Sequence, residues 1–173
     1  MDEKRLMLRH FLAAIAYRTQ KAVRSAPREF GTFSAAEGVR SPQELVRHMG
    51  SVLGYARTFF VGGSHRAEGL TSLDEEVRRL HSILDDLGRH LEHGTPFLQG
   101  VTPERLLQGP LSDAMTHAGQ LALLRRLAGS PVPPENFLFA EVDAARLGPD
   151  QAEPARPDRL WREAPPGWTP PPS

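Results

Sequence analysis

The sequence predicts an all-α protein, a four-helix bundle with a short extra helix and a proline-rich C-terminal tail. Four long stretches place apolar residues three and four positions apart, which is the spacing of one helical face. No region alternates β-branched with polar residues as a sheet would require. The 173 residues are 39% hydrophobic, which is enough for a substantial core. We expect a bundle domain over residues 1–147 and a tail over residues 148–173.

The first two helices are marked by signals at their ends. An apolar stripe over residues 2–24 predicts the first helix, which must stop before Pro27. The second should begin near Pro42, because Ser41-Pro42-Gln43-Glu44 combines an N-cap serine, a first-turn proline and a glutamate that can bond back to the cap. Gly62-Gly63 should end it.

The next two helices are predicted in the same way. Ser72-Leu73-Asp74-Glu75 is a second capping box, so the third helix should run from Leu73 into the low 90s. A short helical turn is expected over residues 103–108. The fourth helix should begin at Gly109-Pro110, with proline at its first position, and end at Gly129.

The chain beyond the bundle changes in character. Pro133-Pro134-Glu135 predicts a shorter helix that reaches about Arg146. Eight of the sixteen prolines then fall within residues 149–173, together with both tryptophans. Such a stretch cannot form a regular helix, so we expect a loosely held tail.

Charge and cysteine content exclude several functions. Lys plus Arg and Asp plus Glu are both 21, so the formal net charge is zero, and the long-range field that attracts nucleic acid or anionic membrane is missing. We therefore expect neither as a partner. The chain has no cysteine, so any metal must be held by histidines and carboxylates. A cytoplasmic location agrees with this composition.

One group of polar residues can carry chemistry. Asp113 and His117 are four residues apart and project from one face of the fourth helix, with Gln120 one turn further along. His48 lies on the apolar face of the second helix. If these helices are neighbours, two imidazoles and one carboxylate converge, and three protein ligands with open positions are typical of a catalytic metal site. The alternative is a hydrogen-bonded core cluster without metal.

Three segments resemble a known family. The segment Thr116 to Phe137 resembles the last core helix of the DinB-like superfamily, Ser41 to Met49 resembles its second helix, and Ala16-Tyr17-Arg18-Thr19 resembles its first. The resemblance implies a four-helix bundle, a homodimer, and a nickel or zinc ion held between helices two and four by three histidines. It also implies relatives that are thiol-dependent transferases and isomerases, including bacillithiol transferases and mycothiol-dependent maleylpyruvate isomerase.

The chain departs from the family pattern at two positions. His48 and His117 match two family ligands, but Asp113 stands where the third histidine is usual, and Ala118 replaces an arginine. The expected ligand set is therefore His48, Asp113 and His117. Two histidines and one carboxylate suit zinc or nickel, with iron or manganese as alternatives. Gln120 could orient a ligand or a metal-bound water.

These residues lead to one functional hypothesis and two alternatives. The first is a metal-dependent enzyme, a thiol-dependent transferase or a hydrolase, that acts on a small molecule with a low-molecular-weight thiol as its implied partner. The second is a non-enzymatic stress-response or binding protein with a polar core cluster. The third is a ferrous-iron oxygenase, which the two-histidine, one-carboxylate set alone suggests.

The remaining polar residues are expected to have ordinary roles. Tyr17 and Arg18 could supply an acid or an anion-binding group if the first helix borders the pocket, although a surface arginine is the simpler interpretation. The pair Arg125-Arg126 should lie on a solvated face. The other histidines that are expected to be solvated are His65, His81, His90 and His93.

Overall fold

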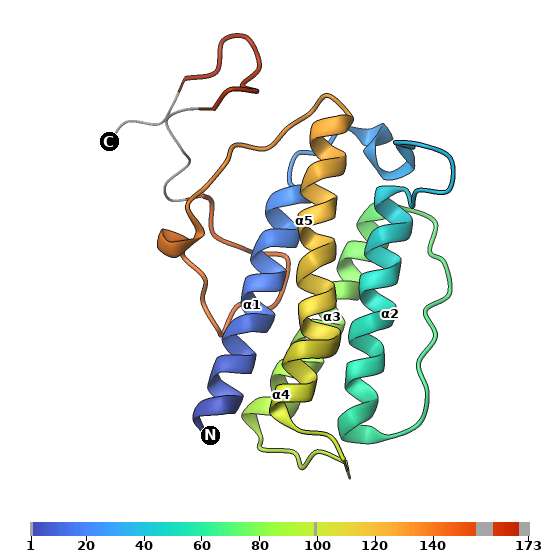
Figure 1. The fold of residues 1–173 in the computed structure, drawn as a ribbon, viewed down its shortest axis with the longest axis vertical. Coiled ribbons are helices and arrows are strands. Elements are labelled where there is room, and N and C mark those ends of the chain that lie inside the picture. Colours follow the sequence, from blue (N-terminus) through green and yellow to red (C-terminus); the bar gives the residue numbers. More distant parts are fainter. Residues whose placement is uncertain (1, 99, 155–160, 170–173) are drawn as a thin grey trace.

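Four long helices pack together in the computed structural model, which describes residues 2–98, 100–154 and 161–169 (Figure 1). No β-strand occurs in these ranges, so the all-α prediction is confirmed. Three of the helices are continuous, and the fourth is made of joined pieces. The helices are α1 (Glu3–Val23), α2 (Pro42–Val61), α3 (Leu73–Glu92), α4 (Pro103–Leu106), the π-helical turn η2 (Leu107–Leu111) and α5 (Ser112–Leu127).

The predicted starts of α2 and α3 are confirmed. Ser41 accepts a hydrogen bond from the backbone N–H of Glu44, and the Glu44 carboxylate accepts one from the backbone N–H of Ser41. Ser72 and Glu75 make the same reciprocal pair at α3. Each box satisfies backbone donors that the helix itself leaves without partners.

The fourth helix begins earlier than its proline suggests. The chain is helical from Pro103, and η2 joins α4 to α5 across a kink where Gly109 has φ −92° and ψ −105°. Pro110 lies inside this helical stretch, where it has no N–H to give to the preceding turn. The short turn predicted over residues 103–108 is therefore continuous with the helix that follows it.

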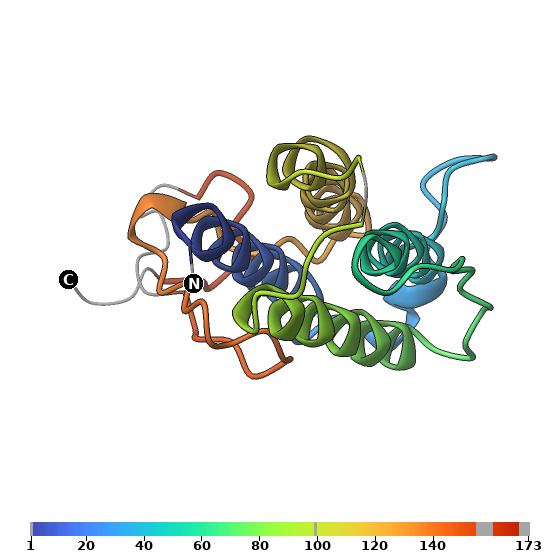
Figure 2. The same cartoon turned by 90° about the horizontal axis from the view of Figure 1, so that it is seen from below.

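The helices form a closed ring of contacts around one core. Both α1 and α2 pack against α3 and α5, and the view along the bundle shows the four around a common centre (Figure 2). The core is aliphatic, with Leu12, Ile15, Leu53, Leu84 and Leu121 all at most 1% exposed. Because α2 and α5 are neighbours, residues on their facing sides can meet.

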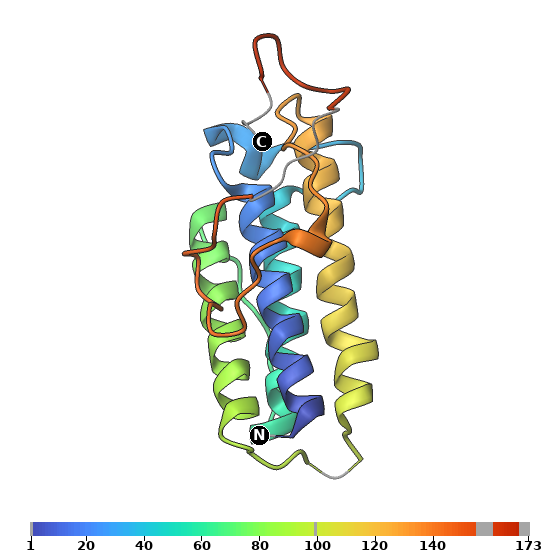
Figure 3. The ribbon, with the colours of Figure 1, turned by 90° about the vertical axis from the view of Figure 1, so that its left-hand side faces the viewer.

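The prediction of a short helix that opens at Pro133-Pro134-Glu135 and reaches about Arg146 is wrong. The segment is mostly extended, with one 3-10 turn at Phe137–Phe139, and it runs along the outside of α1 (Figure 3). The cause is a tertiary contact with α1, which overrides the local preference for a helix. The Glu135 carboxylate is fully buried and accepts hydrogen bonds from Tyr17 (2.7 Å) and Lys21 (2.9 Å) of α1, which ties the chain down where a helix would lift it away.

The following residues continue against α1 and α3. Leu147 is 3% exposed and packs on Gly88, where an added Cβ would lie 2.1 Å from its Cδ1. His81 donates from Nδ1 to the carbonyl of Leu147 at 2.8 Å. His81 is 2% exposed, so the expectation that it is solvated is wrong. It was misread because the segment that covers it is far away in the sequence.

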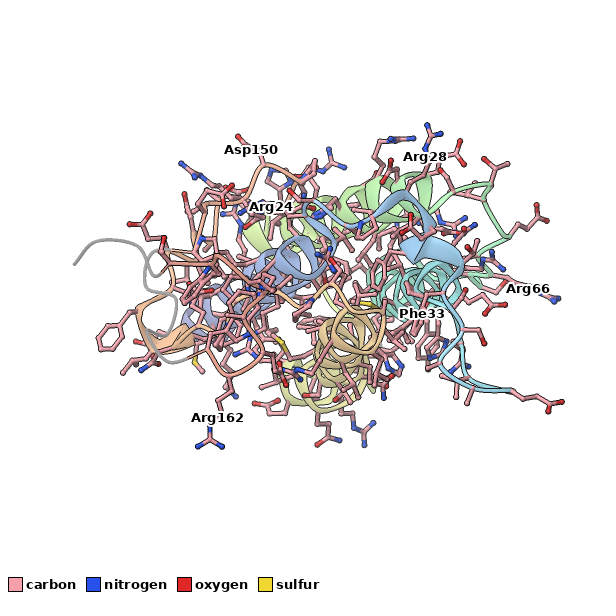
Figure 4. All side chains as sticks on the ribbon, turned by 90° about the horizontal axis from the view of Figure 1, so that it is seen from above. Arg24, Arg28, Phe33, Arg66, Asp150 and Arg162 are labelled. Carbon is pink, nitrogen blue, oxygen red and sulfur yellow. The ribbon has the colours of Figure 1, made fainter. Side chains whose placement is uncertain are left out.

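The first residues of the expected tail are held by α1. Arg24 donates to the carbonyl of Gln151 at 2.6 Å, and it lies beside the segment that carries Asp150 (Figure 4). Residues 155–160 and 170–173 of the tail lie outside the described residues. In the described part no helix is long and apolar enough to cross a membrane.

Arg125 also differs from expectation. It is 4% exposed and donates to the carbonyl of Ser130 at 2.8 Å and to the carbonyl of Ala22 at 3.3 Å. The solvated face predicted for Arg125-Arg126 is thus wrong for Arg125, which joins the end of α5 to the end of α1. Arg126 is exposed and pairs with Glu163.

Candidate metal centre

The structure brings His48, Asp113 and His117 together. His48 comes from α2, and Asp113 and His117 come from successive turns of α5. One ligand atom from each residue lies within 4.8 Å of the other two. In the ranges that the structure describes, this is the one group of three metal-ligating side chains that converge in this way.

Local structure places each of these side chains. Asp113 and His117 share a face of α5 because residues four apart in a helix lie one turn above each other. The kink at Gly109 comes just before Asp113 and sets the direction from which α5 passes α2. His48 lies in the second turn of α2, whose start is fixed by the capping box.

The two nitrogens of His117 are in different surroundings. Nδ1 lies 3.0 Å from Oε1 of Gln120. Because an amide oxygen can only accept, this contact requires a proton on Nδ1. In a neutral ring Nε2 then carries a lone pair. Nε2 is buried and has no hydrogen-bond partner among the described residues.

The carboxylate oxygen that lies near Nε2 is also an acceptor. Oδ1 of Asp113 lies 3.4 Å away, and the His117 side chain is 11% exposed while that of Asp113 is 46% exposed. Two lone pairs this close, with no hydrogen between them, repel each other. A cation between them, or a second proton on His117, would remove the conflict.

His48 completes the group in its neutral form. Its ring meets that of His117 edge to face, with the centroids 4.8 Å apart. Burial, and then the charges of Arg40 and His117, lower the pKa of His48 below the ordinary histidine value, although Asp113 acts in the opposite direction. His48 is therefore neutral at pH 7, which is the protonation state that binds metals.

The three residues fit a divalent metal ion. Metal–ligand bonds of about 2.0–2.2 Å place neighbouring ligand atoms about 3.0–3.5 Å apart. The 3.4 Å between His117 and Asp113 meets this spacing, and rotation of the half-buried His48 and the exposed Asp113 side chains can close the remaining separation. Gln120 keeps the Nδ1 proton in place, a role that acceptors outside the ligand set commonly have at such sites.

Open space lies on two sides of the group. A cleft of about 730 Å³ is bordered by Asp113, Tyr55 and the kinked turn around Gly109. A second cleft of about 550 Å³ is bordered by His48, Arg40 and other polar residues of α2 and the preceding loop. A small molecule can therefore reach the site from either side. Arg40 and Tyr55 were missed because nothing in their sequence context marks them.

Other residues considered from the sequence lie elsewhere. Tyr17 is 1% exposed and bonded to Glu135, and Arg18 borders a separate cavity to which none of the three site residues contributes. His90 stacks on Phe60, with the ring centroids 5.1 Å apart. The remaining histidines therefore stay outside the candidate metal centre.

Comparisons with protein-family models, with curated proteins and with solved structures each found no match to this chain.

Proposed function

We propose that the protein is a metal-dependent enzyme in which His48, Asp113 and His117 hold one divalent ion, zinc or nickel in preference to iron or manganese. The observation that carries the proposal is the pair of acceptors, Nε2 of His117 and Oδ1 of Asp113, which lie 3.4 Å apart, with Nε2 buried and without a hydrogen-bond partner among the described residues. A neutral His48 beside them supplies a third donor. Together these atoms form an open set of three ligands, as catalytic sites do.

Each residue of the candidate metal centre has a defined part in this proposal. A bound divalent ion would lower the pKa of a coordinated water or thiol and so supply a nucleophile near neutral pH. Gln120 fixes the tautomer of His117 so that Nε2 faces inward. Asp113 supplies negative charge, which attracts a cation to the site. The two clefts admit a substrate without movement of the helices.

The reaction we propose is a transfer or a hydrolysis on a small electrophile, with a low-molecular-weight thiol as co-substrate. Support comes from the order of the helices and from the positions of the three residues on the second and fourth helices, both of which agree with the DinB-like resemblance. A cytoplasmic homodimer and a division at residue 147 between bundle and tail belong to the same proposal.

The thiol is tested with protein loaded with cobalt, whose visible spectrum reports on its ligands. Addition of a small thiol should change the spectrum of the wild type, and the loaded protein should consume the thiol when 1-chloro-2,4-dinitrobenzene is present. His117→Ala treated in the same way is the control: its spectrum should not change, and it should consume the thiol no faster than the uncatalysed reaction. A metal-loaded wild type that does not respond to thiol and does not exceed the uncatalysed rate would refute the thiol reaction.

A second candidate is a non-enzymatic protein in which His117 is an imidazolium ion paired with Asp113. The 3.4 Å contact is within ion-pair distance, which favours it as the alternative. It predicts that the wild type takes up no stoichiometric metal. Uptake of one ion per chain would contradict it.

A further inference from the structure

A further cavity, separate from the two clefts beside the candidate metal centre, lies between α1 and α5. It has a volume of about 240 Å³ and is enclosed by α1, α5 and the extended segment over residues 131–137. Its walls combine apolar surface from Ala118, Ala122 and Phe137 with a few charged groups. Drug-sized ligands occupy sites of about 300–1,000 Å³, so this cavity suits a smaller molecule.

The charges around the cavity do not balance. Lys21 pairs with Glu135 at 2.9 Å, and Arg126 pairs with Glu163. Arg18 also borders the cavity, but in the described ranges it has neither an ion-pair partner nor a hydrogen bond. One positive charge is therefore left over in a partly enclosed, mainly apolar space.

The position of Arg18 leaves its donors available. The guanidinium lies over the ring of Phe137, 3.8 Å from the centroid. Stacking of this kind uses the face of the guanidinium and leaves the N–H groups in its plane free to donate. Burial lowers the pKa of Arg18, although Glu135 acts in the opposite direction, and this agrees with a guanidinium that has lost part of its hydration. A bound anion would replace that hydration.

Glu135 attracts the charge of Arg18 but makes neither an ion pair nor a hydrogen bond with it. Its oxygens already accept from Tyr17 and Lys21, and its side chain is fully buried. The pair it forms with Lys21 holds the wall of the cavity in place. The planar fork of a guanidinium matches the two oxygens of a carboxylate, while the apolar walls suit a hydrocarbon body.

We propose that this cavity binds a small organic acid, with its carboxylate on Arg18 and its apolar part between Ala122 and Phe137. The site is independent of the candidate metal centre, which shares no lining residue with it. The ligand class is a monocarboxylate with a short aliphatic or single-ring body, and the protein would thus have a second ligand site, whatever the metal centre does.

The test compares 4-fluorobenzoate with its neutral analogue 4-fluorobenzamide, titrated into the full-length protein and followed by ¹⁹F NMR. The benzoate should bind at least tenfold more tightly than the benzamide. Arg18→Gln should remove this preference and leave the weak affinity for the benzamide unchanged. His117→Ala should retain the preference, because a carboxylate held by the metal centre would lose it.

A second variant tests the cavity without changing the charge of Arg18. An added Cβ at Gly119 meets no atom within 4 Å, and Gly119 borders the cavity. Gly119→Leu should therefore fold normally and block the benzoate by filling the space. The proposal is overturned if the benzoate does not bind, if its preference over the benzamide survives in Arg18→Gln, if that variant loses both probes equally, or if Gly119→Leu binds like the wild type.

Discussion

The buried carboxylate of Glu135 joins the segment after α5 to α1, and its replacement by glutamine should destabilise the protein by about 3 kcal/mol. The change keeps the shape of the side chain and removes its charge. Lys21, which is only 9% exposed, then loses its ion pair with Glu135, and Tyr17 loses a charged acceptor.

The size of the effect follows from the burial of the pair. Removal of one partner from a buried ion pair costs about 3–5 kcal/mol because the other charge is left uncompensated. Lys21 borders the cavity beside α1, and its flexible chain can carry the ammonium toward water, so the lower end applies. With a urea dependence of about 2 kcal/mol per molar, the midpoint should fall by about 1.5 M.

Urea unfolding followed by circular dichroism measures this shift. Glu141→Gln is the matched control, because Glu141 is exposed in the same extended segment, and its midpoint should stay close to that of the wild type. The double variant Lys21→Met/Glu135→Leu should recover most of the loss, since it buries no charge. A loss below about 1 kcal/mol in Glu135→Gln, or a loss equal to that of the control, would refute this explanation of the segment's conformation.

Three further predictions concern single side chains. Burial lowers the pKa of His81, so the folded state binds fewer protons than the unfolded state at low pH. The contribution of a neutral His81 to the free energy of unfolding should therefore be present above about pH 6.5. It should be lost toward lower pH by at most about 1.4 kcal/mol per pH unit. His81→Gln should flatten the pH profile of urea midpoints, and an unchanged slope would contradict the assignment. Gln120→Leu should weaken metal binding by about 10–100-fold, whereas Gln120→Glu, which keeps an acceptor for His117, should not. Competition with a chelator measures both metal affinities, and equal affinities of the two variants would count against the role of Gln120. Gly88→Ala should destabilise the wild type, because the new methyl group meets Leu147. In a Leu147→Ala background the same change should stabilise the protein by about 1 kcal/mol, because alanine favours a helix more than glycine does. Thermal unfolding measures both changes, and a stability change of the same sign in the two backgrounds would exclude the contact.

The helices could be predicted because their signals are local. Ser41 and Ser72 both form the capping boxes that their sequences indicate. The kink at Gly109 was not predicted, because proline after glycine is equally typical of a helix start, and the contacts that carry the helix back to Pro103 come from other elements. The helix expected after Pro134 failed for the same reason, since Glu135 and its partner Lys21 are 114 residues apart.

The candidate site was predictable in part. The spacing of Asp113 and His117 places them on one face, and the capping box at Ser41 fixes the face of α2 that carries His48. The sequence could not provide the free lone pair on Nε2 of His117, which depends on Gln120, or the clefts, which depend on how α2 passes the kinked helix. Arg18 shows the same limit, because its cavity is closed by a segment more than a hundred residues away.

Metal content per chain tests the central claim most directly. Untagged protein, purified without added metal and then reconstituted, is measured by elemental analysis beside His117→Ala and the double variant His90→Ala/His93→Ala. We expect close to one zinc or nickel ion per chain in the wild type and in the double variant, and none in His117→Ala. A wild type that holds no stoichiometric metal after reconstitution, or a His117→Ala variant that keeps it, would contradict the assignment of His48, Asp113 and His117 as a metal centre.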